Sequence, residues 1–194
     1  MLSELLWIAF ARKIRGAEEI LHGLLDKSDK AKKSLLQYFH KDTVAGYFDY
    51  VLPVEEWCKD SDDSGVGKMY DFLMNDLEDL DWEDVKKVID IYVSGKAFGY
   101  AGHQFLELMK ERADEHPEDV LRWMCAYTDT EHQDDDNVFL HSQAMSVIVA
   151  AYSAIRKYDK ESRLLEDALK AMDKLLADRE VRRGVKAFLY ELDH

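Results

Sequence analysis

The sequence predicts an all-α fold, and three observations support this prediction. Apolar residues recur at helical spacing along almost the whole chain of 194 residues, and no segment alternates convincingly with the period of two that marks a half-buried strand. Hydrophobic residues make up 47% of the chain, which is enough for a substantial core. Only two prolines, Pro53 and Pro117, interrupt the chain, so a turn-rich β architecture is disfavoured.

The first 80 residues predict three helices followed by a segment of mixed character. Three apolar faces mark the helices, with a bend expected at Gly16: Leu2, Leu5, Leu6, Ala9 and Phe10; Ile20, Leu21, Leu24 and Leu25; Leu35, Leu36 and Phe39. The segment DTVAGYFDYVLPVEEW, residues 42–57, contains Gly46 and Pro53 and gives no clear prediction. A further helix is expected around Met69, Phe72, Leu73 and Leu77.

Start signals define two more helices. Asp81 is expected to cap a helix that begins at Trp82, because its carboxylate can accept hydrogen bonds from the free amides of the first turn. Pro117 is expected to open another helix, since its missing amide is harmless at the first helical position. Both helices carry acidic residues in the first turn, which suit the positive end of the helix dipole. The apolar face of the first of these helices consists of Val85, Val88, Ile89, Tyr92 and Val93.

The last third of the chain also reads as helices. Residues 138–155 carry no charged side chain but include serine, glutamine and histidine, which favours a buried helix over a membrane span. Two amphipathic helices, residues 163–178 and 179–193, are expected to close the chain. The apolar face of the former is predicted from Leu164, Leu165, Ala168, Leu169, Met172, Leu175 and Leu176.

The helices repeat weakly along the chain. WEDVKKVI at residue 82 and PEDVLRWM at residue 117 share the letters E-D-V and stand 35 residues apart. The apolar stretches YAGHQFLELM and VFLHSQAMSV follow them, and their histidines, His103 and His141, stand 38 residues apart. Paired helices with such spacing resemble HEAT-like α-solenoid repeats over about residues 80–194. The C-terminal half also looks like the helical-repeat regions appended to large bacterial NTPases, without their nucleotide site.

This resemblance implies antiparallel helical hairpins stacked as a short right-handed array. Each pair of helices then buries its apolar face against the next pair, and an extended, often concave surface remains for a partner. The resemblance marks no catalytic residue. We expect one domain, residues 1–194, made of an N-terminal helical portion at 1–80 and HEAT-like hairpins at 81–194.

The formal charge of −14 comes from the middle of the chain. Residues 51–137 carry 24 acidic and 8 basic side chains, whereas each flanking part has a net charge of +1. Such a field repels nucleic-acid phosphates and anionic membranes and attracts basic surfaces, so we expect a basic protein partner and no direct binding to nucleic acid or membrane. Solubility alone is the other interpretation of this charge.

The location expected for the protein is the cytoplasm. The start, MLSELLWIAFARK, lacks the early basic residues and the cleavage site of a secretory signal. Cys58 and Cys125 have no C-x-x-C partner, which favours a reducing compartment and ordinary core thiols over disulfides or a thiolate metal site.

Residues 58–72, CKDSDDSGVGKMYDF, admit three interpretations. A phosphate loop of the form G-x-x-x-x-G-K-[ST] is disfavoured, because Asp62 replaces the first glycine and Met69 replaces the hydroxyl residue. An EF-hand-like calcium loop would use oxygen ligands from Asp60, Asp62, Ser64 and Asp71, but no second loop is present to pair with it. A soluble acidic connection between two helices is the favoured interpretation.

A second acidic segment, TDTEHQDDDNVFLHS, covers residues 128–142. It contains no H-E-x-x-H or related spacing, so a solvated loop is favoured over a metal site. His103 and His141 lie in apolar segments and are expected in the core. The two acidic segments supply the residues expected to contact a basic partner: Glu131, Asp134, Asp135, Asp136, Asp62 and Asp63.

The sequence offers no catalytic or cofactor motif. It contains no G-x-S-x-G, no local arrangement of cysteine and histidine, and no glycine-rich dinucleotide motif, so we expect neither enzyme activity nor a cofactor. The favoured function is a noncatalytic protein-interaction module that presents an acidic helical-repeat surface. Two alternatives stay open: an acidic inhibitor or immunity protein that blocks a nucleic-acid-binding enzyme or toxin, and a calcium- or metal-binding helical protein.

Overall fold

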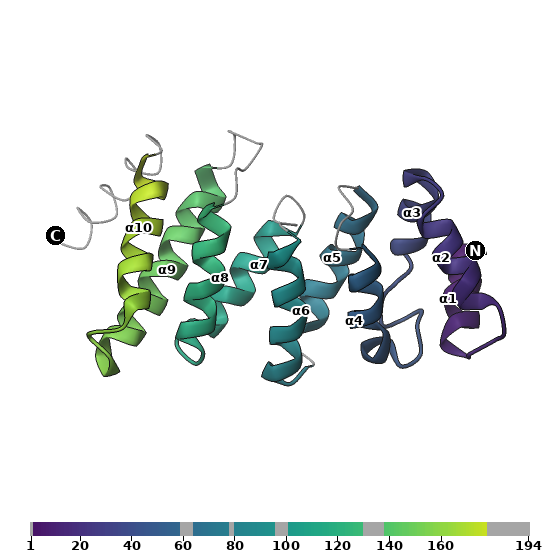
Figure 1. Ribbon diagram of the computed structural model, residues 1–194, viewed down its shortest axis with the longest axis horizontal. Coiled ribbons are helices and arrows are strands. Elements are labelled where there is room, and N and C mark those ends of the chain that lie inside the picture. The colour runs from purple at the N-terminus through teal and green to yellow at the C-terminus, as the bar shows by residue number, and fades with distance from the viewer. Residues whose placement is uncertain (1, 59–63, 78–79, 96–100, 130–137, 178–194) are drawn as a thin grey trace. The chain divides into compact units, whose positions relative to one another are not determined.

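Ten α-helices form the described part of the computed structural model, which covers residues 2–58, 64–77, 80–95, 101–129 and 138–177. Figure 1 shows the helices in their order along the chain. These residues contain no strand, so the prediction of an all-α fold is confirmed for the part of the chain described. Within the same ranges, no helix has both the length and the apolar character that a membrane crossing requires.

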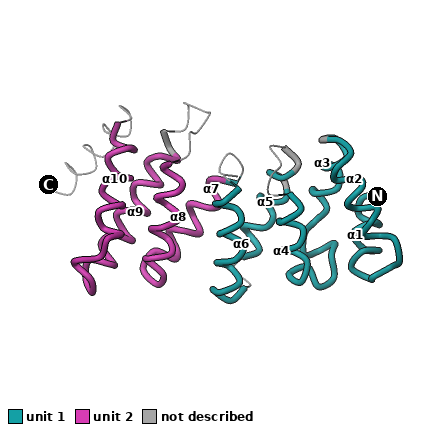
Figure 2. The backbone as a smooth tube through the Cα atoms, in the orientation of Figure 1, with its two compact units in different colours: residues 1–101 teal, residues 102–194 magenta. Residues whose placement is uncertain are grey.

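The chain forms two compact units, residues 1–101 and residues 102–194 (Figure 2). The first unit contains α1 (Leu2–Ala11), α2 (Ala17–Leu25), α3 (Asp29–Leu36), α4 (Tyr47–Cys58), α5 (Ser64–Asp76) and α6 (Trp82–Ser94). The second contains α7 (Gly102–Arg112), α8 (Pro117–Asp129), α9 (Val138–Tyr158) and α10 (Arg163–Ala177). The single domain expected from the sequence stays a prediction.

The first unit is built on contacts among α1, α2 and α3, followed by α3 against α5 and α4 against α6. Trp7 of α1 is fully buried, and its Nε1 donates a hydrogen bond of 2.8 Å to the carbonyl oxygen of Leu35. The Trp7 ring also lies 4.7 Å, centroid to centroid, from the ring of Phe39. The three predicted N-terminal helices are confirmed, but Gly16, with φ of 86°, separates α1 from α2 instead of bending one helix.

The segment that gave no clear prediction from sequence forms most of α4. Pro53 lies inside this helix, where it removes one backbone donor, and the helix continues past it to Cys58. Asp81 precedes α6 with an extended backbone, as predicted, but its side chain makes no capping hydrogen bond. Its carbonyl oxygen instead accepts from the amides of Asp84 and Val85, at 2.9 and 3.0 Å. The capping role predicted for the Asp81 carboxylate is therefore wrong.

The second unit packs α7 and α8 against α9, and α10 against both α8 and α9. Gln143 of α9 bridges to α7, since its Nε2 donates to Glu107 Oε1 at 2.8 Å and its Oε1 lies 3.2 Å from His103 Nδ1. His103 is exposed, so its predicted place in the core is wrong, whereas His141 is half-buried. Pro117 begins α8, as predicted.

The amphipathic faces agree closely with the predicted spacing, with a few exceptions at their edges. The buried residues of α6 are Val85, Val88, Ile89 and Tyr92, and Val93 is half-buried. In α10 the buried residues are Leu165, Ala168, Ala171 and Leu175. Leu169 is 51% exposed, because it lies at the edge of the arc that these four residues define on the helix.

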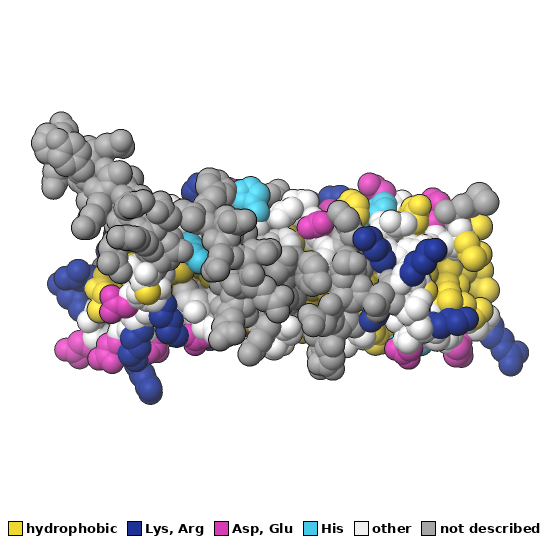
Figure 3. All heavy atoms as spheres, turned by 90° about the horizontal axis from the view of Figure 1, so that it is seen from above, with side chains coloured by type: hydrophobic (Ala, Val, Ile, Leu, Met, Phe, Trp, Pro, Cys, Tyr) yellow, Lys and Arg dark blue, Asp and Glu magenta, His cyan; other side chains and the backbone are white. Residues whose placement is uncertain are grey.

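Exposed apolar side chains gather on α1, α2 and the turn between them, at the N-terminal end of the first unit (Figure 3). They are Leu2, Leu5, Ile14 and Ile20, each more than half exposed. Helices α1 and α2 and the turn between them therefore expose some apolar side chains, next to exposed charged residues such as Glu18 and Glu19.

Candidate functional site

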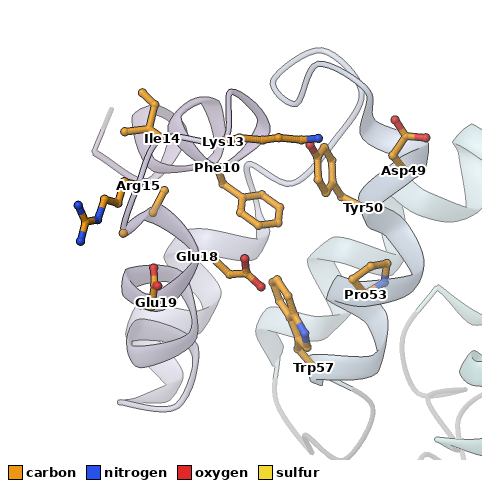
Figure 4. Close-up of a pocket in the computed structure, with 12 residues that line it drawn as sticks. Phe10, Lys13, Ile14, Arg15, Glu18, Glu19, Asp49, Tyr50, Pro53 and Trp57 are labelled. Carbon is orange, nitrogen blue, oxygen red and sulfur yellow. The ribbon is translucent and has the colours of Figure 1, made fainter.

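A pocket of about 530 Å³ lies between the α1–α2 turn and α4 in the first unit (Figure 4). Three aromatic side chains, Phe10, Tyr50 and Trp57, supply its ring-lined wall. Charged and exposed side chains line the rim: Lys13, Arg15, Glu18, Glu19 and Asp49. An aromatic wall combined with a few charged groups is the usual make-up of a binding pocket, and this volume is in the usual range.

The α1–α2 turn shapes one side of the pocket. Lys13 has φ of 54° and Gly16 has φ of 86°, so the backbone enters the left-handed region at two nearby positions. Glycine adopts this conformation without steric cost, whereas a residue with a Cβ is strained there. The amide of Lys13 donates to the carbonyl of Phe10 at 2.8 Å, which closes the end of α1. The turn therefore holds Phe10 in place and carries the charged rim beside it.

Helix α4 supplies the other side of the pocket. Tyr50, Pro53 and Trp57 share one face of α4, because positions three, four and seven apart lie near each other on a helix. The Phe10 ring lies 4.8 Å from the Tyr50 ring and 5.8 Å from the Trp57 ring, centroid to centroid. The Tyr50 hydroxyl also donates to the carbonyl of Ala11 across 3.4 Å. The rings of Phe10, Tyr50 and Trp57 thus connect α4 to the end of α1, and the pocket lies beside them.

The Trp57 ring is supported from a second direction by α2. His22 lies 4.0 Å from it, centroid to centroid, with an interplanar angle of 53°. Both side chains are half-buried, as is Tyr50. Trp57 and Tyr50 are therefore held by neighbours while part of each ring stays accessible.

The charged groups of the rim differ in their orientation (Figure 4). The Glu18 carboxylate points in toward Trp57, whereas the Arg15 guanidinium points away from the rings. The Lys13 side chain runs along the edge of the pocket toward Tyr50, and Asp49 points away from the ring wall. A carboxylate is therefore directed at Trp57, and the Lys13 side chain reaches the wall at Tyr50.

This arrangement favours binding of a positive group. The face of an aromatic ring is electrically negative and attracts cations, and a carboxylate attracts them through its charge. The described residues that line the pocket include no serine, threonine, cysteine or histidine, and its charged groups are carboxylates, a lysine and an arginine.

The residues predicted from sequence to form a site do not contribute to this pocket. Those predicted to contact a basic partner, and two of the calcium candidates, lie outside the described residues: Glu131, Asp134, Asp135, Asp136, Asp60, Asp62 and Asp63. The other two calcium candidates, Ser64 and Asp71, belong to α5, about 10 Å apart along the helix axis. Their roles stay predictions.

No metal cluster is found in the described ranges, where no three histidine, cysteine, aspartate or glutamate side chains come together. Cys58 is buried, as predicted for a core thiol. Cys125 is half-buried beside α10, and burial raises the pKa of its thiol to about 11, which keeps it protonated and unreactive at neutral pH.

Apart from the pocket, two buried acidic residues lie in the described part of the first unit, Glu55 of α4 and Asp76 of α5. Glu55 is 0% exposed, and neither of its carboxyl oxygens has a hydrogen-bond partner of normal geometry among the described residues. Burial raises its pKa to about 9, and the Tyr70 hydroxyl nearby opposes this shift only in part. Asp76 is also buried, but it pairs with Lys41 at 3.1 Å. Glu55 is therefore neutral at pH 7 and Asp76 is paired.

Sequence reasoning missed the pocket. The spacing of Tyr50, Pro53 and Trp57 is a helical signal, but it lies in the segment that gave no clear prediction. Phe10 precedes Tyr50 by 40 residues, and no pattern in the sequence shows that the two rings meet. Only the packed helices bring the wall and the rim together.

Comparison with known proteins assigns this chain to no family. No protein-family model matches the sequence, no curated protein matches it, and no solved structure matches the chain.

Proposed function

We propose that this chain is a noncatalytic protein-interaction module that binds a basic segment of a partner protein. The observation that carries this proposal is the pocket between the α1–α2 turn and α4, where a carboxylate points toward an aromatic wall (Figure 4). The formal charge of −14 supports it, because the long-range field of such a chain attracts positive partners. The binding site requires no cofactor and no metal.

The fold that we propose for the module is a short right-handed array of HEAT-like helical hairpins. Alternate packing of helices supports this proposal. In the first unit α3 packs against α5 and α4 against α6, and in the second α7 packs against α9 and α8 against α10. Stacked hairpins pack in this way, because each pair of helices covers the apolar face of the next pair.

A match between two stretches of sequence gives further support. VGKMYDFLM at residues 66–74 and AGHQFLELM at residues 101–109 stand 35 residues apart and share a glycine and the letters L-M. The shared glycines, Gly67 and Gly102, are both buried in the first turns of their helices. Gly67 of the acidic stretch thus has a counterpart at an equivalent position of another helix, which favours a structural role over a phosphate or calcium loop.

Pairs of aromatic rings follow the same interval. In the first unit Tyr70 of α5 meets Tyr92 of α6, with centroids 4.8 Å apart. In the second unit Phe105 of α7 meets Tyr127 of α8, with centroids 6.2 Å apart. Each residue of the second pair stands 35 residues after its counterpart in the first. The repeat proposed from the letters E-D-V therefore extends over two helices.

The location proposed for the module is the cytoplasm, and the proposed partner is a basic protein. Cys58 and Cys125 are both free thiols, which suits a reducing compartment. Direct binding to nucleic acid or to an anionic membrane is disfavoured by the charge, because phosphates are repelled.

The test of this proposal is binding of a labelled peptide of alternating arginine and glycine, measured by fluorescence anisotropy. We expect binding at about 50 mM salt that weakens at about 300 mM, since exposed charges are screened over about 10 Å at 0.1 M. The control peptide replaces arginine with glutamate and is expected not to bind. Absence of binding to the arginine peptide at the lower salt concentration would contradict the proposal.

A further inference from the structure

We infer that the pocket between the α1–α2 turn and α4 receives the guanidinium group of an arginine side chain. This inference rests on the proposed function and names the group that the pocket recognises. Three features of the described residues carry it: the half-buried rings of Tyr50 and Trp57, the direction of the Glu18 carboxylate, and the directions of the two basic side chains on the rim.

The rings provide a surface on which a flat cation can stack. Tyr50 and Trp57 are half-buried and share one face of α4, and Phe10 is packed between the end of α1 and both rings. A guanidinium is planar and weakly hydrated, so it stacks on an aromatic ring at a lower desolvation cost than an ammonium. Because His22 supports Trp57 from α2, the stacking surface is held in place before the ligand arrives.

The carboxylate provides the second contact. Glu18 belongs to the first turn of α2 and points toward Trp57 (Figure 4). A guanidinium that stacks on the ring presents its N–H groups at its edge, where a carboxylate accepts two of them in parallel. Trp57 and Glu18 therefore recognise the face and the edge of the same group.

The basic residues of the rim do not occupy this place. Arg15 points away from the rings, and Lys13 runs along the edge toward Tyr50 (Figure 4). Both add positive charge near the mouth, so the pocket discriminates against cations that depend on charge alone. A ligand that also stacks and forms a bidentate contact overcomes this repulsion better than a lysine ammonium does.

The test uses three capped tripeptides in which glycine flanks arginine, lysine or citrulline. Citrulline keeps the shape of arginine but carries no charge. Binding is followed through the indole N–H signal of Trp57 in NMR spectra, assigned with the Trp57→Phe variant. We expect the arginine peptide to shift this signal and to bind roughly tenfold more tightly than the citrulline peptide, and more tightly than the lysine peptide.

Two variants separate a specific contact from the general field. Glu18→Gln is expected to weaken arginine binding by roughly tenfold, because the bidentate contact is lost. Asp26→Asn removes the same charge at the other end of α2, about 12 Å away along the helix axis, and Asp26 does not line the pocket, so a change of less than about twofold is expected. Both residues are exposed, so neither change is expected to disturb folding.

The outcomes distinguish this inference from the proposed function. Equal binding of arginine and citrulline, equal effects of Glu18→Gln and Asp26→Asn, or an unshifted Trp57 signal would overturn the arginine pocket. If the labelled peptide of alternating arginine and glycine still binds in that case, the proposed interaction module stands, and the peptide binds at another place on the chain. If no basic peptide binds at low salt, both proposals fall.

Discussion

Glu55 is a carboxyl group that the first unit buries at a position suited to an apolar side chain. It stands 34 residues before Ile89 and, through the next interval of 35, corresponds to Met124, and both of these residues are fully buried. Val51 corresponds in the same way to Val85. In the proposed repeat, Glu55 is therefore a polar residue at a core position that is apolar in the other helices, and its proton keeps it neutral.

The first prediction concerns the pH dependence of stability. The pKa of Glu55 rises from 4.5 to about 9 on folding, so between these values the folded state holds a proton that the unfolded state releases. Stability from this group is therefore fully present below pH 4.5 and is lost as pH rises, by up to about 1.4 kcal/mol per pH unit. The free energy of unfolding, measured in urea, is expected to be roughly 2 to 4 kcal/mol higher at about pH 5 than at about pH 8.

The matched variants for this prediction are neighbours on α4. Glu55→Gln cannot ionise and is expected to remove most of the pH dependence, so it unfolds at higher urea than the wild type at about pH 8. Glu56→Gln changes an exposed carboxylate and is expected to leave the dependence as it is. If the unfolding free energy of Glu55→Gln depends on pH as much as that of the wild type, Glu55 is ionised in the folded protein.

The second prediction concerns Trp7. Its Nε1 donates to the carbonyl of Leu35, and this bond is buried. Trp7→Phe removes the indole donor, although the amide of Tyr38 still donates to that carbonyl at 3.0 Å, and it leaves a smaller ring in a fully buried position. Together these changes are expected to cost about 1 to 3 kcal/mol of unfolding free energy in urea titrations. Leu5→Ala, on the same helix but 56% exposed, is the control and is expected to change stability by less than about 0.5 kcal/mol. Equal effects of the two changes would mean that α1 does not pack as described.

At the scale of elements, the left-handed backbone of Gly16 directly precedes the start of α2 at Ala17. Gly16 has φ of 86°, whereas Gly23 lies inside α2, and a Cβ would meet no atom within 4 Å at either position. The two glycines therefore differ in backbone conformation and not in available space.

The third prediction follows from this difference. Gly16→Ala is expected to destabilise the protein by about 1 kcal/mol, because alanine is strained in the left-handed region. Gly23→Ala is expected to stabilise it by about 0.5 to 1 kcal/mol, because alanine favours the helix interior. Thermal unfolding of the two variants measures both effects, and changes of the same sign would contradict the described turn.

Helical spacing in the sequence was sufficient to predict most elements but not the pocket. The buried face of α6 follows directly from the interval between Val85, Val88 and Tyr92, because a local period reports which side of a helix is covered. For α4 the local signal was ambiguous, since Pro53 disfavours a helix interior, and packing against α6 and against the rings of Phe10 and His22 supports the helix. The contact of Phe10 with Tyr50 depends on tertiary packing, which no local period encodes.

At the scale of the whole molecule, charge is the property that separates this chain from a neutral helical scaffold. The acidic excess lies in residues 51–137, and its most acidic stretches fall outside the described residues. The pocket is in the first unit, where rings and one carboxylate are held together by helix packing. In the proposed function, the field attracts a basic partner and the pocket recognises one of its side chains.

The fourth prediction tests that division of roles. Raising the salt concentration is expected to slow association of the arginine and glycine peptide, because steering by the field is screened. Glu18→Gln is expected to act mainly by speeding dissociation, because it removes a contact made only in the complex. Stopped-flow fluorescence measures both rates, and a Glu18→Gln effect confined to association would contradict a direct contact.

The most direct measurement of the central claim is a backbone NMR titration of the protein with the arginine and glycine peptide at low salt. The expected result is a set of shifted signals that clusters in residues 10–19 and 49–57, around the pocket. Signals that shift only elsewhere in the chain, or that do not shift at all, would contradict recognition of a basic segment at this site.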